Sequence, residues 1–166
     1  MARIVVGPDD FDIGAEFARL AAGRTDIGGI GCFVGIVRGA HGVDGDARPV
    51  VAPPVVAMTL EHYPGMTERA IERIAAEAEA RWPLFGCTVI HRVGRLGLGD
   101  NIVLVIAASA HRQAALDATA FLIDWLKTKA PFWKREEFAD GSGAWVDARE
   151  ADDTAAARWG GDQPKP

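Results

Sequence analysis

The most informative part of the chain for its architecture is residues 87–112, CTVIHRVGRLGLGDNIVLVIAASAHR. Cys87–Val93 and Asn101–Ala110 are apolar and rich in β-branched residues, which favours two strands joined by the glycine-rich connection 94–99. The second segment is apolar on both faces, a pattern typical of a strand at the centre of a sheet. Apolar spacing from about His111 to Thr128 then predicts a helix. We therefore expect a central strand that leads directly into a long helix.

Periodic segments on either side of this stretch complete a mixed set of elements. Apolar patterning predicts strands over 3–6, 28–38 and 55–63, and a short helix that runs up to Trp159. Pro131 ends the long helix, and 132–138 with 144–147 then form a hairpin closed over 140–143. Because the elements show no strict strand–helix–strand repeat, the fold class is predicted to be α+β. The expected architecture is a mixed, largely antiparallel sheet with packed helices and a C-terminal β-hairpin.

Two helices have apolar faces and N-cap residues that can be identified in the sequence. Asp12 is the expected N-cap of the first helix, and Thr67 of the second. In the strand that precedes the second helix, alternation places Val56 and Met58 on one face. The residues expected to face the core are Ile13, Phe17, Leu20 and Ala21 in the first helix and Ile71, Ile74, Ala75, Ala78 and Trp82 in the second.

The domain organisation follows from one segment without periodicity. Residues 39–54 contain three Gly, three Pro and three charged residues, so we expect a mobile surface loop there. Residues 160–166 are expected to fray. Neither a repeat nor a linker divides the remainder, and residues 1–159 are therefore expected to form a single domain, as is usual for a chain of 166 residues.

Composition excludes several classes of function. Lys and Arg total 18 against 23 Asp and Glu, which gives a net charge of −5 and disfavours a nucleic-acid partner. The longest apolar run, Ile102–Ala108, is too short to cross a membrane, and no signal peptide is visible. Cys32 and Cys87 form neither a CxxC motif nor a zinc pattern. We expect a cytoplasmic protein with no metal site and no cofactor.

The densest group of basic residues lies at the end of the long helix and just after it: Lys127, Lys129, Lys134 and Arg135. Lysines at a helix C-terminus complement the helix dipole, which accounts for Lys127 and Lys129 without any ligand. Lys134 is bracketed by Phe132 and Trp133, and apolar neighbours strengthen the action of a charge on a bound anion. A solvated helix end and an anion-binding pocket both remain open interpretations.

A second basic group and one strand add further candidates for an anion site. His111 and Arg112 stand at a helix N-terminus, where cations are unfavourable unless an anion compensates them. Arg38 ends the strand 28–38, in which Phe33 shares a face with Gly31 and Gly35. Something flat or another backbone can approach such a face, although a tight bend of the sheet explains it too and is favoured by the strand alone. Phe33 and Arg38 can serve one site only if the strand ends or bulges between them.

Four motifs in chain order carry a family resemblance. They are LEHYPGM (60–66), VIHRVG (89–94) with Gly99-Asp100, SAHR (109–112) and LKTKAPFWKRE (126–136). Together they resemble the catalytic (large) subunit of molybdopterin synthase, and the likeness spans nearly the whole chain down to Trp159. The resemblance implies an α/β hammerhead-like fold and a single catalytic domain. The loop 39–54 departs from the family pattern in being longer and richer in Gly and Pro, so no contact is carried over from it.

The resemblance implies a sulfur-transfer reaction of molybdenum cofactor biosynthesis. The substrate would be cyclic pyranopterin monophosphate, which receives two sulfurs to form the dithiolene of molybdopterin. The sulfur donor would be the C-terminal Gly-Gly thiocarboxylate of a small ubiquitin-like carrier subunit. Two large subunits would form a homodimer, and each would take one carrier to give a heterotetramer. A nucleophile brought by the partner would explain why neither cysteine lies in a reactive environment.

The resemblance also assigns roles to individual residues. Lys127 and Lys134 would be the catalytic pair, and the substrate would be bound by Arg38, His111, Arg112 and, less directly, Arg149. Phe33 joins the candidate substrate-binding residues because of its place in the strand 28–38, not because of the resemblance. Thiocarboxylate and cyclic phosphate are both anions, so their approach requires fixed positive charge. Crowded lysines lower one another's pKa, which would leave one amine neutral as a base or acyl acceptor.

Helix length places a limit on this site. Fifteen residues separate Arg112 from Lys127, which is about 22 Å in a continuous helix. One small substrate cannot touch both ends, so we expect each site to combine the two lysines of one protomer with His111 and Arg112 of its twofold partner. The alternative function is a non-enzymatic module that binds a phosphorylated metabolite through the same residues.

Overall fold

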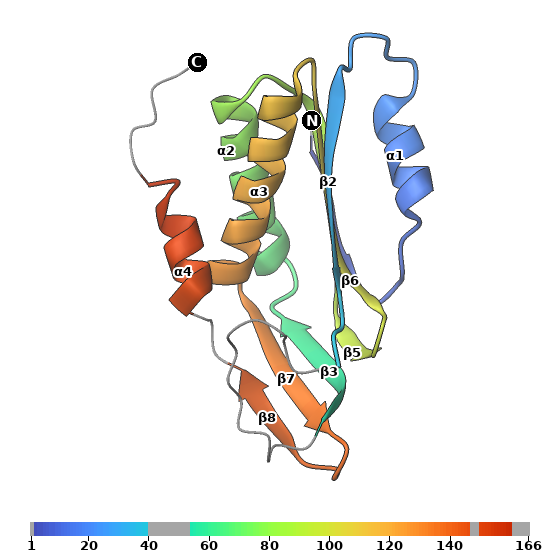
Figure 1. Ribbon diagram of the computed structural model, residues 1–166, viewed down its shortest axis with the longest axis vertical. Helices are drawn as coiled ribbons and strands as arrows, with labels where there is room; N and C mark the ends of the chain where they lie inside the picture. Colours follow the sequence, from blue (N-terminus) through green and yellow to red (C-terminus); the bar gives the residue numbers. More distant parts are fainter. Residues whose placement is uncertain (1, 40–53, 147–149, 161–166) are drawn as a thin grey trace.

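The computed structural model describes residues 2–39, 54–146 and 150–160, and its elements form an α+β fold of two sheets and four helices (Figure 1). Sheet A has the strand order β1-β4-β6-β2, in which β1 is parallel to β4 and the other neighbours are antiparallel. The predicted central strand is β6, which lies between β4 and β2. The strands of sheet A are β1 (Arg3–Gly7), β2 (Gly29–Ile36), β4 (Leu84–Arg92) and β6 (Asn101–Ser109).

Helices cover both faces of sheet A. On one face lie α2 (Met66–Arg81) and α3 (Arg112–Thr128), with α4 (Glu150–Ala157) packed against α3. The shorter α1 (Ile13–Ala21) lies on the opposite face (Figure 1). The first core cluster packs the predicted stripe of α2 and the inward residues of α3 against β4 and β6, and the second packs Ile90, Leu104 and Ile106 under α1.

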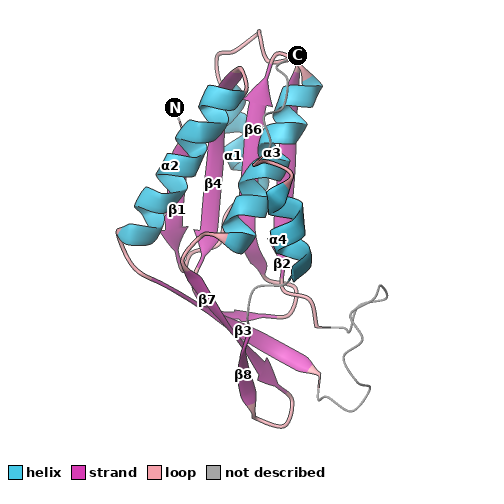
Figure 2. Ribbon diagram, turned by 90° about the vertical axis from the view of Figure 1, so that its left-hand side faces the viewer, coloured by secondary structure: helices cyan, strands magenta, loops and turns pink. Residues whose placement is uncertain are grey.

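Sheet B is antiparallel and lies at one end of sheet A (Figure 2). Its order is β5-β3-β7-β8, and β7 with β8 is the predicted hairpin. The glycine-rich connection after β4 contains a strand of its own, β5, that the sequence did not predict. The four strands are β3 (Val55–His62), β5 (Gly94–Gly97), β7 (Phe132–Phe138) and β8 (Gly143–Val146). A third core cluster of Val37, Met58, Leu60 and Leu96 joins this sheet to the end of β2.

The apolar face predicted for α1 is wrong in its first half. Asp12 caps the helix as predicted, since its carboxylate accepts a hydrogen bond of 2.9 Å from the Ala15 N–H. Ile13 and Phe17, however, are exposed, and Glu16 between them is buried. Glu16 is held there by the guanidinium groups of Arg3, at 3.0 Å, and Arg19, at 3.3 Å. Paired charges thus occupy a position that apolar spacing alone assigns to solvent.

The N-cap predicted for α2 is also wrong. Gly65, with φ of +78°, occupies the cap, and its N–H donates to the Glu68 carboxylate at 2.6 Å. Thr67 is instead buried in the first turn, where its hydroxyl donates to the Pro131 carbonyl at 3.3 Å. The hydroxyl therefore ties the start of α2 to the start of β7.

Strand β3 is irregular at its beginning. The pairing of β3 with β7 shifts between Val55 and Ala57, which is the signature of a β-bulge. Val56 is exposed while Ala57 and Met58 are both buried, so the predicted common face of Val56 and Met58 is wrong. Regular alternation resumes from Met58.

The apolar sequence of the strand predicted over 28–38 indicates burial, but β2 is the edge strand of sheet A, and Cys32, Phe33 and Ile36 are exposed. Its glycines allow α3 to lie very close. A Cβ atom at Gly31 would be 2.5 Å from the Ala115 carbonyl oxygen, and one at Gly29 would be 3.2 Å from the Arg112 Cα. The glycines of β2 therefore leave room for the backbone of α3 to pack directly against the strand.

A buried histidine lies where the two sheets meet. The His91 ring, at the end of β4, stacks on Phe132 of β7 at 3.9 Å between centroids, and its Nδ1 lies 2.9 Å from the Arg92 carbonyl. Burial is the main cause that lowers the pKa of His91 from 6.5 to about 4, and the charge of nearby His62 lowers it further.

This buried ring predicts an acid-dependent loss of stability. The pKa of His91 is lower in the folded than in the unfolded chain, so the unfolded chain binds more protons between pH 6.5 and 4. As the pH is lowered from 6.5 to 4, the free energy of unfolding should therefore fall by up to about 3 kcal/mol, since each unit of pKa difference corresponds to about 1.36 kcal/mol. Urea unfolding of the parent chain and of His91→Gln at several pH values measures it. The variant should have a flatter profile, and equal slopes for both proteins would contradict the prediction.

Candidate functional site

Strand β7 presents the predicted lysine on the face of sheet B that carries the third core cluster. Lys134 is the pairing partner of Leu60 on β3, and Glu136 is the partner of Met58. Because side chains alternate along a strand, Trp133 and Arg135 point to the opposite face. Lys134 is therefore half-buried beside apolar residues, which separates it from the exposed Arg135 that follows it in sequence.

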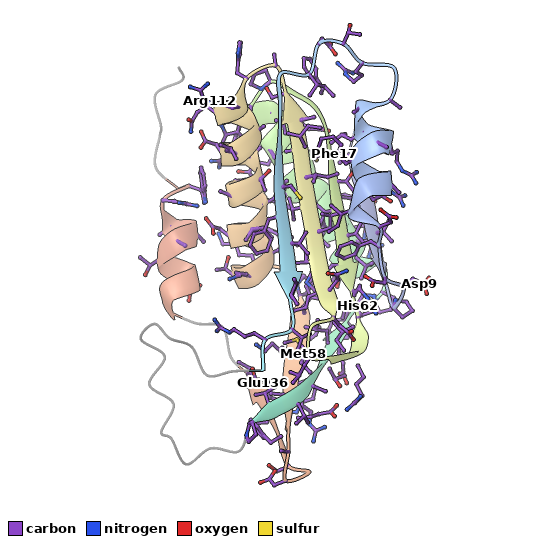
Figure 3. The ribbon with its side chains drawn as sticks, turned by 45° about the vertical axis from the view of Figure 1, so that its right-hand side comes forward. Asp9, Phe17, Met58, His62, Arg112 and Glu136 are labelled. Carbon is purple, nitrogen blue, oxygen red and sulfur yellow. The ribbon has the colours of Figure 1, made fainter. Side chains whose placement is uncertain are left out.

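A buried carboxylate accompanies Lys134. The Lys134 Nζ lies 3.2 Å from the Glu136 Oε1, and Glu136 is only 6 % exposed. Figure 3 shows Glu136 close to Met58, at the end of the molecule that sheet B forms. An ion pair in this position fixes the ammonium group beside the third core cluster. Sequence reasoning missed Glu136, although a Lys-x-Glu spacing on a predicted strand puts both side chains on one face.

Lys127 lies at the same end of the molecule as Lys134. It stands in the last turn of α3, which is followed by Lys129 at the C-cap and then by β7. Lys127 and Lys129 are both exposed, so the helix-dipole interpretation still applies to them. Because α3 leads directly into β7, two of the predicted basic residues, Lys127 and Lys134, nevertheless lie at the junction between α3 and sheet B.

Arg38 reaches the same end of the fold from β2. The pairing of β2 with β6 shifts between Gly35 and Ile36, and the strand ends there, which is the condition required for Phe33 and Arg38 to serve one site. Val37 is then buried against Leu60, the pairing partner of Lys134. Arg38 follows directly and is exposed. The structure thus places Arg38 next to the residues that surround Lys134.

His111 and Arg112 lie at the other end of the molecule. His111 is the N-cap of α3 and Arg112 its first residue, and both are exposed. Figure 3 shows Arg112 at the end of α3 far from Glu136, in agreement with the length expected for this helix. One copy of the chain therefore does not bring Arg112 to Lys134. Arg149 lies outside the described residues, as does most of the predicted loop 39–54 and all but Gly160 of the tail.

A hollow of about 280 Å³ on sheet B is lined by other residues: Glu61, His62, Tyr63, Trp133 and Trp145. The Tyr63 and Trp133 rings meet edge to face at 4.7 Å between centroids. No residue of the predicted site lines this hollow, and its charged residue is the acidic Glu61. Its chemistry does not suit a small anion.

The two cysteines have environments that oppose thiolate formation. Burial raises the pKa of Cys87 to about 12 and also raises the pKa of Cys32. Within residues 2–39, 54–146 and 150–160, no three His, Cys, Asp or Glu side chains gather in a way that would hold a metal ion. No helix in these ranges is both long and apolar enough to cross a membrane.

Comparison with known proteins gives a consistent set of relatives. The family described as MoaE protein matches residues 6–129. A molybdopterin synthase catalytic subunit from Mesorhizobium japonicum is 54% identical over 151 residues, which is 90% of this chain and 88% of the relative. The solved structure of a molybdopterin biosynthesis MoaE protein from Burkholderia ambifaria is 50% identical, has a TM-score of 0.77, and is matched over 98% of this chain and 100% of its own.

A more distant structure shares the fold. It is a protein–protein complex of subunits 1 and 2 of the molybdopterin-converting factor from Helicobacter pylori, with a TM-score of 0.62 and 20% identity over 90% of each chain. At this identity the likeness concerns the fold alone.

Proposed function

The chain belongs to the MoaE protein family, the family of molybdopterin synthase catalytic subunits, and on this premise we propose how its residues perform the reaction. We propose that it transfers sulfur from the C-terminal thiocarboxylate of a small ubiquitin-like carrier subunit to cyclic pyranopterin monophosphate. The solved Helicobacter pylori complex contains two different subunits of the molybdopterin-converting factor. The reducing cytoplasm expected from the cysteine content is part of the same proposal.

The observation that carries this proposal is the position of Lys134. Its ammonium group is half-buried among apolar residues and paired with a buried carboxylate, in a chain with a net charge of −5. A solvated lysine on a strand needs no such partner. A fixed cation at the junction of α3 and sheet B, with Lys127 and Arg38 at the same end, is suited to hold two anions together.

Each basic residue has a role that follows from its place. Lys127 and Lys134 act on the thiocarboxylate and the reacting pterin carbon: one stabilises negative charge, and the other takes a proton or receives the acyl group of the carrier. Arg38 and the His111–Arg112 pair bind the phosphate and pterin, for which the forked guanidinium is well suited. Phe33 offers an exposed ring for the flat pterin. Arg149 is kept as a further binding residue.

A conversion assay tests the proposal directly. Purified chain is mixed with a thiocarboxylated carrier ending in Gly-Gly and with the cyclic pterin, and the dithiolene product is measured. We expect product only when all three components are present. Binding of the pterin without conversion would contradict the proposal and would instead favour the non-enzymatic binding module.

The separation of Arg112 from Lys134 predicts complementation between two inactive chains. In a twofold dimer with shared sites, a mixed dimer of Arg112→Ala and Lys127→Ala has one site with both changes and one with neither. Each variant alone should be nearly inactive, whereas a mixture refolded together should recover about a quarter of the parent activity, because half the dimers are mixed and each keeps one of two sites. Activity of the mixture no higher than the mean of the separate variants would rule out a shared site.

A further inference from the structure

An aromatic cluster joins the end of α4 to two other helices. Trp159, two residues after α4, meets the Trp82 ring at 5.7 Å and the Phe121 ring at 5.6 Å between centroids, and both contacts are edge to face. Trp82 is the C-cap of α2, and Phe121 is buried in α3. Trp159 therefore packs against α2 and α3 at once.

Hydrogen bonds hold Trp159 from both helices. Its Nε1 donates to the Asp124 carboxylate of α3 at 2.8 Å, and the same oxygen accepts from the Arg158 guanidinium at 2.6 Å. From α2, the Arg81 guanidinium donates to the Trp159 carbonyl at 2.9 Å. We define the Trp159 anchor as the six residues that make these contacts: Arg81, Trp82, Phe121, Asp124, Arg158 and Trp159.

The anchor decides where α4 lies. This helix has eight residues, and an isolated helix of that length is barely stable in water. Figure 1 shows α4 beside the half of α3 that leads into β7, in agreement with the packing of α4 on α3. The contacts of Trp159 with α2 and α3 therefore fix the segment that follows β8.

This segment begins and ends beside the two lysines of the candidate site. Val146, the last residue of β8, is the pairing partner of Lys134. Val146 and Glu150, the first residue of α4, are four residues apart, so their Cα atoms lie within about 14 Å of each other. At the other end, Asp124 precedes Lys127 by three residues, or about 4.5 Å along α3. The anchored segment thus links the strand that carries Lys134 to the helix that carries Lys127.

The direct connection between the two lysines is short and leaves their separation dependent on one bend. α3 ends at Thr128 and β7 begins at Phe132, so residues 129–131 set the direction of β7 relative to α3. Among the described residues, β8 is an edge strand that pairs only with β7. An attachment of β8 to α3 on the far side of β7 resists any change in this angle. A displacement of about 1 Å in a catalytic group can cost about 10²-fold in rate, so the angle matters for the reaction.

We propose that Trp159 and Asp124 are positioning residues for the sulfur transfer. They pin the C-terminal segment to α3, and through β8 this segment holds Lys134 at a fixed distance from Lys127. The inference rests on the function proposed above and adds two residues that touch neither substrate nor carrier.

Loss of the anchor should lower the rate of conversion without weakening pterin binding. In single-turnover assays we expect a loss of about 10²-fold for Trp159→Ala and about 10-fold or more for Asp124→Ala. The dissociation constant of the pterin should stay close to that of the parent, because Arg38 and Arg112, which are proposed to bind the phosphate, are not part of the anchor. Circular dichroism checks that each variant is folded, and Asp124→Ala leaves the ring contacts of Trp159 in place.

Two further variants are matched controls. Asp124→Asn keeps an oxygen that accepts the Trp159 Nε1–H, so it should retain most of the parent rate. Asp117 lies two turns earlier on α3 and accepts a hydrogen bond of 2.8 Å from Gln113 of the same helix, so Asp117→Ala should convert pterin like the parent. Equal losses in Asp124→Ala and Asp117→Ala would overturn the role of the anchor.

A double-mutant cycle separates positioning from a general loss of stability. If Trp159 acts by placing Lys134, then Trp159→Ala should change the residual rate of the Lys134→Ala variant by less than about threefold. If the full loss of about 10²-fold recurs in that background, Trp159 does not act through Lys134 and the proposal is wrong.

Hydrogen exchange tests the attachment without any assay of activity. The backbone amides of β7 and β8 should exchange about tenfold faster or more in Trp159→Ala than in the parent, whereas those of β4 and β6 should keep their rates. Unchanged exchange in β7 and β8 overturns the inference, even if the parent chain converts the pterin normally. If the parent converts no pterin, the proposed function fails, and hydrogen exchange alone then upholds or overturns the attachment of β8 to α3.

Discussion

Replacing Lys134 by alanine is expected to lower the rate of conversion about 10³-fold in the presence of saturating carrier and pterin. The substitution removes a fixed positive charge from a partly buried position where two anions must meet, and losses of 10²–10⁴-fold are usual for such groups. Because Arg38 and Arg112 still bind the phosphate, the dissociation constant for the pterin should change much less than the rate. Single-turnover assays and equilibrium binding measured side by side distinguish the two effects.

The same basic segment contains a matched control. Lys129 lies at the C-cap of α3, is exposed, and is not among the residues assigned to the site. Lys129→Ala removes an identical charge two residues after Lys127, so conversion by this variant should stay close to the parent rate. If Lys129→Ala and Lys134→Ala lose activity equally, the segment acts through its overall charge and the assignment of Lys134 is wrong. Glu136 should then matter little as well.

Gly31→Ala is expected to destabilise the fold by about 3 kcal/mol or more. A methyl group at this position would lie 2.5 Å from the Ala115 carbonyl oxygen and 2.5 Å from the Thr119 hydroxyl oxygen, which are themselves joined by a hydrogen bond of 2.8 Å. Neither atom belongs to the flexible end of a long side chain, so β2 and α3 must move apart. Overpacking of a close contact typically costs 1–3 kcal/mol, and the loss of this hydrogen bond adds to it.

Urea unfolding of Gly31→Ala and Gly7→Ala together provides the measurement. Gly7 is the last residue of β1, another strand of sheet A, but a Cβ atom there would meet nothing within 4 Å. Its replacement should therefore change the unfolding midpoint only slightly. Similar midpoints for the two variants would show that β2 and α3 are not in close contact in solution.

Much of the fold was predictable because its elements are long and periodic. The central strand β6, the helices α2 and α3 and the hairpin of β7 and β8 all lie where apolar spacing placed them. Strand β5 was not predictable, since four residues within a glycine-rich connection give no periodicity. The edge position of β2 was not predictable either, because its apolar residues are typical of a buried strand. Only the packing of the whole sheet distinguishes a strand that faces a protein core from one that faces solvent.

The sequence predicted the basic residues of the candidate site but not the residues that pair with them. The clustering of Lys127 with Lys134 and the distance from Arg112 follow from sequence spacing and helix length alone. The pairing of Lys134 with Glu136 required the burial of that carboxylate, which depends on β3 and on the end of β2. Thr67 illustrates the same limit: its hydroxyl binds a carbonyl 64 residues away, at Pro131, instead of capping its own helix.

The glycine at position 31 also constrains how this family can drift in sequence. Ala115 and Thr119 fit against a strand that has no side chain there, so a bulkier residue at 31 becomes acceptable only where the facing turn of α3 has moved outward. Such a shift would also displace Arg112, which stands one turn earlier on the same helix. We therefore expect substitutions in the middle of β2 to occur together with substitutions in the first turns of α3. A chimera that takes only one of these two segments from a relative should pack poorly at their contact.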